Sequence, residues 1–211
     1  LTIPNACDNE FFQQNDPDFT LPLWAVNKKI FIYTGSLGLM DECMQIIKGI
    51  ELLFDNPGII FVFIGEGKEK AGLENYVRQK HIPGVYFIVL IPKTEVRSWL
   101  QYAYAAFVTF KDIPMLQTSS PNKMFDAFAV GVPIIQSTKG WIKELLEKEN
   151  CGISVDPGLP LEMCDAIKRL VDNPGERNKM SDASKRLAST DFNRKLLAGK
   201  YLEELKSLIE L

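Results

Sequence analysis

The stretch "TSSPNKMFDAFAVGVPIIQS", residues 118–137, has in order the features of a loop, a helix and a buried strand. Ser119 and Ser120 are residue types that cap helices, and Pro121 suits the first turn of one. A glycine and a proline then end the helix before an apolar run. This order places a helix N-terminus beside the end of a strand. Free backbone N–H groups there, together with Lys123, favour the binding of an anion such as phosphate.

The same succession of strand, glycine turn and helix occurs twice before this stretch. "KIFIYTG" (29–35) and "IIFVFIGEG" (59–67) are apolar runs that end at glycines and precede helical patterns. They do not alternate with polar residues, which is typical of strands covered on both faces. Further strands are expected at 85–90, 105–110, 132–137 and 151–156. The sequence therefore predicts an α/β fold, a Rossmann-like three-layer α/β/α sandwich with a mostly parallel six-stranded sheet.

Three segments are distinguished by their composition. Residues 1–27 are rich in Asn, Asp, Pro and Phe without periodicity and are interpreted as an interdomain linker or amino-terminal arm. Residues 28–190 form the Rossmann-like unit. Residues 191–211 are expected to be a carboxyl-terminal helix, docked through the apolar residues that recur at helical spacing in "YLEELKSLIEL". These are Leu202, Leu205 and Ile209.

Composition excludes several function classes. A net charge of −3 and a pI near 5.4 argue against a protein that neutralises nucleic-acid backbone. The cysteines show no zinc-ligand spacing and are expected to be reduced thiols. They are Cys7, Cys43, Cys151 and Cys164. No stretch approaches the roughly 20 apolar residues of a transmembrane helix, and the start lacks the basic region of a signal peptide, so we expect a soluble cytoplasmic protein.

Ligands of parallel α/β sheets bind outside the carboxyl ends of the strands. In the first loop there, Gly35 and Ser36 can let a diphosphate approach the backbone, although such glycines are often only turn residues. In the second loop, Gly65 precedes Lys68, which either contacts an anion or is simply solvated. In the third loop, Ile91 and Pro92 could form an apolar surface for a nucleotide base, or the loop is an ordinary connection.

The fourth loop carries the strongest signal. Lys123 opposes the dipole of its own helix, an arrangement that a bound anion would relieve. Asp126 follows three positions later on a similar face, where it could accept hydrogen bonds from a ribose diol or simply pair with Lys123. The only histidine, His81, lies in a connection away from these loops. A Ser/His/Asp or Cys/His catalytic arrangement is therefore not expected.

Together these motifs resemble the carboxyl-terminal domain of family 4 glycosyltransferases, which have the GT-B fold and transfer sugar with retention of configuration. The resemblance covers residues 28–173 and is strongest in "SPNKMFDAFAVGVPII". "IPNACDNEFF" (3–12) is also similar to the sequence that joins the two domains in this family. The resemblance is strongest toward enzymes that build capsule, O-antigen or other surface polysaccharides.

The resemblance implies a role for each loop. Lys123 and Asp126 would be the catalytic pair, with the lysine stabilising the leaving diphosphate and the aspartate holding the ribose hydroxyls. The other implied donor-binding residues are Gly35, Ser36, Gly65, Lys68, Ile91, Pro92, Lys93, Thr118, Ser119, Ser120 and Asn122. No metal and no other cofactor is required, because amides, helix dipole and lysine supply the positive charge. The implied partners are a nucleotide sugar, an acceptor glycan or polyprenyl-linked sugar, and an amino-terminal acceptor domain.

The sequence departs from the family pattern in the charged positions. Thr118 and Asp126 stand where the family has two glutamates, and "GSLGLMDEC" lacks the arginine and lysine that usually follow the first strand. We expect a donor-binding domain that is inactive alone, from an enzyme of the cytoplasm or the inner face of the membrane. The alternatives are a non-catalytic nucleotide-binding or interaction module, and half of a sugar-nucleotide epimerase.

Overall fold

The structure is a computed structural model that describes residues 3–53 and 56–209. The described residues form a six-stranded sheet with the strand order β3-β2-β1-β4-β5-β6. Every neighbouring pair is parallel, as the sequence predicts for most of the sheet. The strands are β1 (Lys29–Thr34), β2 (Ile59–Ile64), β3 (Val85–Ile88), β4 (Ala103–Val108), β5 (Ile134–Gln136) and β6 (Gly152–Ser154).

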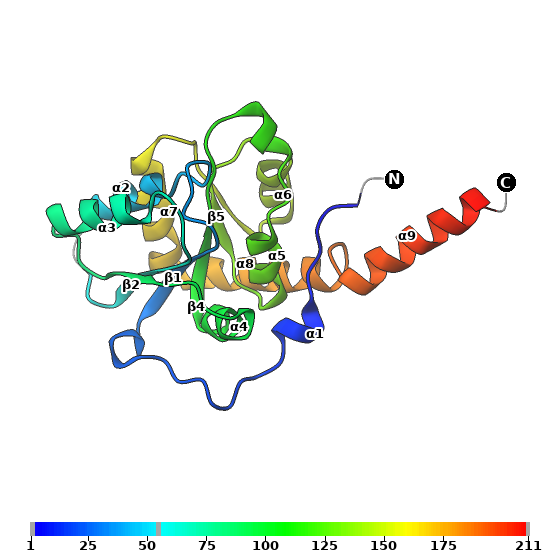
Figure 1. Cartoon of the computed structure of the whole chain (residues 1–211), viewed down its shortest axis with the longest axis horizontal. Helices are drawn as coiled ribbons and strands as arrows, with labels where there is room; N and C mark the ends of the chain where they lie inside the picture. Colours follow the sequence, from blue (N-terminus) through cyan, green and yellow to red (C-terminus); the bar gives the residue numbers. More distant parts are fainter. Residues whose placement is uncertain (1–2, 54–55, 210–211) are drawn as a thin grey trace.

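Helices cover both faces of this sheet, which confirms the three-layer architecture (Figure 1). One face packs against α2 (Cys43–Glu51), α3 (Lys70–Gln79) and α7 (Pro160–Asp172). The other packs against α4 (Lys93–Gln101), α5 (Asn122–Ala129), α6 (Trp141–Glu149) and α8 (Pro174–Ser189). Short elements complete the chain before the last helix: α1 (Asn9–Phe12), η1 (Leu23–Ala25) and η2 (Pro114–Thr118).

The central strands owe their place in the core to apolar residues on both sides. In β1, Phe31 and Tyr33 face the α2 side while Ile30 and Ile32 face the α5 side, and all four are buried. Burial of each such side chain contributes about 1.5–3 kcal/mol relative to exposure. A strand with one polar face could not occupy this position, so the continuous apolar runs decide the layer order.

The order of strands in the sheet reverses direction between β1 and β4. The loops that follow these two strands are joined by hydrogen bonds. The Thr109 hydroxyl donates to the Asp41 carbonyl at 2.6 Å, and the Lys111 N–H donates to the Met40 carbonyl at 3.0 Å. In a doubly wound sheet this reversal point is where ligands bind. The loops singled out in the sequence therefore meet at one edge of the sheet.

The amino-terminal segment lies outside the sheet but contributes to the core. Cys7 and Phe12 are fully buried with α5 and α8, a contribution that the composition of residues 1–27 does not indicate. Asp8 begins α1 by accepting a hydrogen bond from the Phe11 N–H at 3.2 Å. The segment therefore packs against the domain from outside, on the side of the sheet that carries α5.

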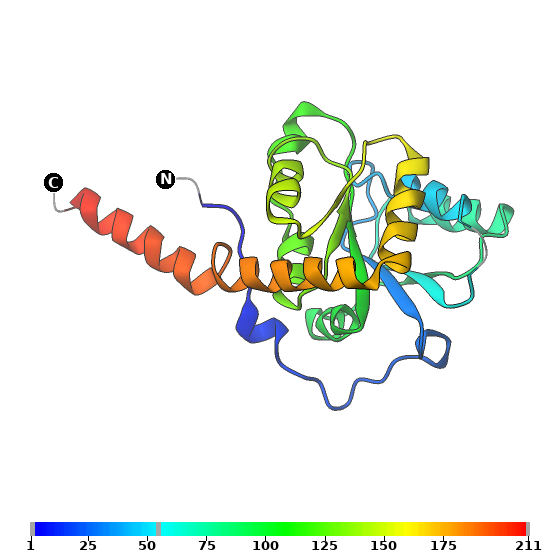
Figure 2. The ribbon, with the colours of Figure 1, turned by 180° about the vertical axis from the view of Figure 1, so that it is seen from behind.

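The last helix, α9 (Arg194–Ile209), extends away from the body of the molecule (Figure 2). Leu197 near its start is buried, but Leu202 and Leu205 are 53% and 39% exposed. The start of α9 is therefore docked, but the expectation of a docked amphipathic helix is wrong for the stretch that carries Leu202 and Leu205; the side chain of Ile209 lies outside the description. No helix within 3–53 and 56–209 has the length and apolar composition needed to cross a bilayer.

Candidate nucleotide-binding site

The loops after β1 and β2 pack directly against each other at the carboxyl edge of the sheet. The Leu37 N–H donates to the Glu66 carbonyl, and the Glu69 N–H donates to the Leu37 carbonyl, both at 2.9 Å. Gly65 has φ of +152° and leaves no room for a side chain beside Gly35. These glycines therefore have a structural role in loop contact, and they also leave the backbone at Gly35 exposed.

The N-terminus of α5 differs from its expected form. The helix begins at Asn122 with Pro121 as N-cap and has no side-chain capping bond, so the expectation of a serine cap is wrong. The hydroxyl of Ser120 instead accepts from the Asn5 N–H at 3.0 Å, and the carbonyl of Ser119 accepts from the Trp141 indole at 2.8 Å. Ser120 is thus engaged by the amino-terminal segment, which a local pattern cannot indicate.

Lys123 carries its charge from α5 into the loop after β1. Its ammonium lies 2.9 Å from Asp41 Oδ1, 2.5 Å from the Tyr33 hydroxyl and 4.2 Å from the centre of the Tyr33 ring. A Cβ atom on Gly35 would lie 3.3 Å from Lys123 Cε. The structure therefore brings Lys123 and Gly35 together. It does not pair Lys123 with Asp126, which has a different partner.

Tyr33 and Asp41 form a buried polar network around that ammonium. The Tyr33 hydroxyl lies 2.9 Å from Asp41 Oδ1 and 2.6 Å from the Ser36 carbonyl, and can donate its proton to either. Asp41 Oδ2 accepts from the Gly38 N–H at 3.3 Å. Burial, and then the nearby Cys43 and Asp41, raise the pKa of Tyr33 far above its usual range. The phenol therefore stays neutral and serves only as a hydrogen-bonding group.

Asp126 lies on the side of α5 that faces α1 and α4. Its Oδ1 is 3.5 Å from the ammonium of Lys93, which also lies 5.1 Å from the centre of the Phe12 ring. Burial raises the pKa of Asp126, and Lys93 opposes that shift. The third loop thus supplies the counter-ion of Asp126. Of its other residues, Ile91 packs against the core and Pro92 is the N-cap of α4.

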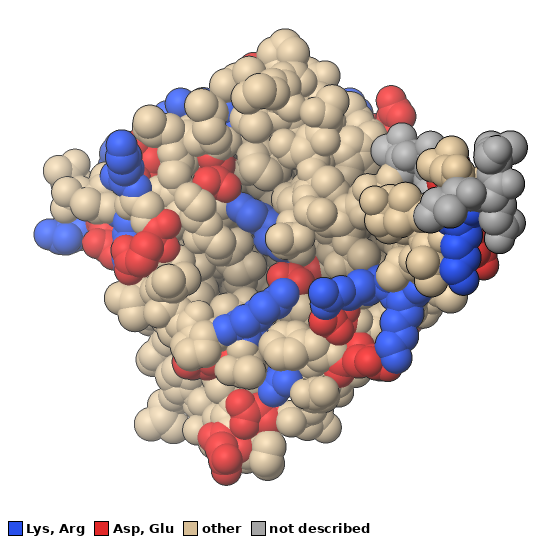
Figure 3. Space-filling view, turned by 45° about the vertical axis from the view of Figure 1, so that its right-hand side comes forward, with Lys and Arg blue, Asp and Glu red and all other residues tan. Residues whose placement is uncertain are grey.

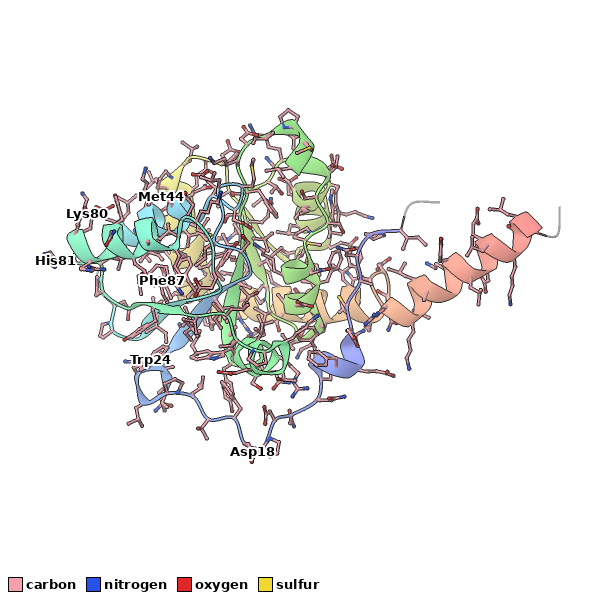
Figure 4. The ribbon with its side chains drawn as sticks, in the orientation of Figure 1. Asp18, Trp24, Met44, Lys80, His81 and Phe87 are labelled. Atoms are coloured by element: carbon pink, nitrogen blue, oxygen red, sulfur yellow. The ribbon has the colours of Figure 1, made fainter. Side chains whose placement is uncertain are left out.

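The remaining predicted residues lie on the surface of this edge. Ser36, Lys68 and Asn122 are exposed. Thr118 is exposed too, and its hydroxyl donates to the Met115 carbonyl at 2.9 Å within η2. His81 lies at the outer end of α3 beside Lys80, remote from α5 (Figure 4). Its remote place agrees with the expectation that it takes no part in the site.

Sequence reasoning missed three side chains that surround Lys123. Tyr33 and Asp41 bind its ammonium, and the ring of Phe110 lies 5.4 Å from it. Asp41 was detectable only as an acidic residue at the end of a glycine-rich loop. Tyr33 and Phe110 lay in strand patterns, where aromatic residues usually indicate core packing. Their common role depends on contacts between segments far apart in the sequence.

Charged side chains of both signs are mixed around the candidate site. Basic and acidic residues are interspersed over the face shown in Figure 3, in keeping with the formal net charge of −3. Among the described residues, no group of His, Cys, Asp and Glu side chains could hold a metal ion. The arrangement offers an exposed glycine backbone, one largely buried ammonium and, on another side of α5, a carboxylate. Such a set suits a ligand that carries both phosphate and hydroxyl groups.

Residues 17–187 match the protein family described as "Glycosyl transferases group 1". The chain belongs to this family. The matched segment contains the complete sheet and every helix from α2 to α7. As a group 1 glycosyl transferase domain with this α/β architecture, the chain has the GT-B type of fold that its motifs resemble.

Curated relatives are longer than this chain. Spore coat protein SA of Bacillus subtilis is 26% identical over 183 residues, which cover 78% of this chain and 45% of the relative. The putative colanic acid biosynthesis glycosyl transferase WcaI of Escherichia coli is 29% identical over 105 residues, which cover 50% of this chain and 25% of the relative. The chain thus spans less than half the length of these two proteins.

Solved structures show the same fold at low sequence identity. Anabaena Alr3699/HepE, crystallised with UDP-glucose, has a TM-score of 0.78 at 14% identity, and the match covers 96% of this chain and 56% of that one. The carboxyl-terminal domain of a group 1 family protein, LpcC, from Francisella tularensis has a TM-score of 0.65 at 20% identity. This match covers 79% of this chain and 88% of that one. This chain is therefore similar both to a domain that was crystallised by itself and to part of a longer chain.

Proposed function

We propose that this group 1 domain binds the nucleotide-sugar donor of a retaining glycosyltransferase, with the donor diphosphate lying against the loop at Gly35 and the ammonium of Lys123. One observation carries the proposal: α5 delivers a largely buried ammonium to the exposed glycine loop after β1, at the point where the order of strands in the sheet reverses direction. A fixed cation beside glycine backbone that a ligand can approach closely suits a diphosphate.

The other predicted residues extend the site along the same edge. Asp126 would accept the ribose hydroxyls after its pair with Lys93 opens, and Ile91 to Lys93 would contact the base. Ser36, Lys68 and residues 118–122 would surround the phosphates. Lys123 would stabilise the leaving diphosphate as positive charge develops on the sugar carbon. We predict that this requires no metal ion.

The acceptor side of the reaction is assigned to a second, amino-terminal domain. The match covers only 45% of spore coat protein SA and 56% of the Anabaena chain. The names of WcaI and of the lipopolysaccharide core glycosyltransferase LpsD of Rhizobium meliloti support an acceptor of the surface-polysaccharide type. We propose a glycan or polyprenyl-linked sugar as acceptor, and a complete enzyme that works in the cytoplasm or at the inner face of the membrane.

Binding of UDP and GDP tests the proposal directly. The unliganded domain should gain thermal stability with millimolar UDP or GDP, since a ligand that binds only the folded state raises the melting temperature. Lys123→Met should weaken binding at least tenfold, because it removes the cation and keeps the length of the side chain. Lys139→Met is the matched control, since Lys139 lies at the same edge but pairs with Asp112 on the surface. An unchanged melting curve with both nucleotides would contradict the proposal.

A second candidate is a nucleotide-binding module without transferase activity. Thr118 and Asp126 favour it, because they replace the two glutamates of the family pattern, and Thr118 bonds only within η2. Turnover of a labelled UDP-sugar by the domain joined to its natural amino-terminal partner would exclude this candidate. Binding of UDP without turnover by that complete protein would favour it over the enzyme.

A further inference from the structure

The cation proposed to bind phosphate already has an anionic partner. Lys123 and Asp41 each expose only 12% of their side chains, and their charged atoms lie 2.9 Å apart. Asp41 is held from its other side by the Gly38 N–H and through its backbone carbonyl by the Thr109 hydroxyl. The ion pair is therefore built into the junction of the loops after β1 and β4.

An ammonium has three N–H donors, and the described residues engage two of those on Lys123. Asp41 Oδ1 accepts one and the Tyr33 hydroxyl accepts another. The third has no acceptor among the described residues, and the ammonium lies beside Gly35, where a Cβ atom would be 3.5 Å from Lys123 Nζ. The loop itself, residues 35–42, contains no lysine or arginine. Its cation comes from α5, and its only buried charge is the carboxylate that balances this cation.

We propose that Asp41 is the resident counter-ion of Lys123, which keeps the empty site near neutrality and lowers its affinity for a diphosphate. The inference rests on the proposed function and concerns the same site. A diphosphate that approaches Gly35 meets a paired charge instead of a free cation. Asp41 therefore makes binding weaker and release of the diphosphate product easier.

This role has a consequence that a purely structural role lacks. Removal of one partner of a buried ion pair destabilises a fold, because the other charge is left uncompensated. Here a bound diphosphate can compensate Lys123 in place of Asp41, since opposite charges a few ångströms apart attract strongly in a partly buried site. Loss of the Asp41 charge should therefore lower the stability of the empty domain and raise its affinity for the ligand. A residue that only supports the loop would lower both.

Asp41→Asn tests whether stability falls while affinity rises. Thermal unfolding measures the stability and calorimetry measures the affinity for UDP. We expect a lower melting temperature without ligand, and UDP binding about tenfold tighter than in the unchanged domain. Uridine, which has no phosphate, should bind both forms equally. In the Lys123→Met background the Asp41→Asn change should alter UDP affinity less than twofold, because the two residues act as one pair. Asp112→Asn is the matched control. It removes the exposed partner of Lys139 at the same edge and should alter UDP affinity less than twofold.

If the unchanged domain binds UDP, equal or weaker UDP binding by Asp41→Asn would overturn the counter-ion role. If this variant does not unfold cooperatively, Asp41→Ser removes the charge, keeps a hydroxyl and is judged by the same criteria. Inorganic pyrophosphate separates the inference from the proposed function. Tighter pyrophosphate binding by the variant, with no UDP or GDP binding by any form, would support the counter-ion role and contradict nucleotide-sugar binding. No tightening with either probe would overturn the counter-ion role itself.

Discussion

Gly65 packs directly on the backbone of Gly35, and a Cβ atom built on Gly65 would lie 1.8 Å from the Gly35 carbonyl oxygen. The Gly35 N–H donates in turn to the Ile64 carbonyl at 3.0 Å. The first and second loops of the sheet edge are therefore one rigid unit. The position of the exposed Gly35 backbone beside Lys123 depends on this contact.

Gly65→Ala should destabilise the domain by several kcal/mol, because the added methyl meets backbone that cannot give way and the φ of +152° is strained for alanine. Gly72→Ala is the matched control. Gly72 lies in α3 with nothing within 4 Å of its added Cβ, so this change should stabilise by about 0.5–1 kcal/mol. Urea unfolding measures both. Equal stability of the two variants would show that the loop contact is not tight.

Asp126→Asn should raise the melting temperature at neutral pH. Burial raises the pKa of Asp126, so the folded domain binds that proton more tightly than the unfolded chain does. Ionisation therefore costs stability above the raised pKa, and the cost disappears as the pH falls below both pKa values. The gain from Asn should shrink accordingly on acidification. Asp18→Asn, on the exposed arm (Figure 4), should show no such gain. A gain that grows at low pH would contradict the assignment.

The thiols should be inert toward a disulfide reagent in the folded domain at mildly alkaline pH. All four cysteines are free and buried. Burial raises the pKa of Cys7, Cys43 and Cys151 to about 12, and the thiolate is the reactive form. Full reaction is expected only after unfolding in urea. Rapid modification of any thiol without urea would show that its segment opens readily.

The outer half of α9 should exchange its amide hydrogens much faster than α7. Tyr201 and Leu208 are 56% and 64% exposed, whereas Met163 and Ile167 of α7 are fully buried. A helix without tertiary packing is only marginally stable in water. Mass spectrometry of the exchanged domain would measure the difference. Strong protection in α9 would indicate that another surface covers it in solution.

The layer order and the location of the site could be predicted from local patterns. The apolar runs at 29–35 and 59–67 became central strands, and the runs at 85–90 and 105–110 overlap β3 and β4. Gly35 and Lys123, which were each expected to contact an anion, lie together at this edge. Both follow from rules of sheet winding, which place every strand end at one edge.

The partners of the charged groups could not be predicted in this way. Lys123 and Asp126 have the spacing of an intrahelical pair, but each bonds a residue from another segment. Ser120 has the chemistry of a helix cap, but it bonds Asn5 across 115 residues of sequence. A side chain chooses the partner that burial and packing bring within reach, and local spacing carries no information on that choice.

The sequence by itself determined the architecture, because the period of its apolar residues dictates which segments can be buried on both sides and which on one. Only the tertiary structure decided which charges of the candidate site are paired. Asp41 and Lys123 are separated by 82 residues and meet because β1 and β4 lie side by side in the sheet. Their Coulombic interaction depends on distance and burial, and both are set when the chain has folded.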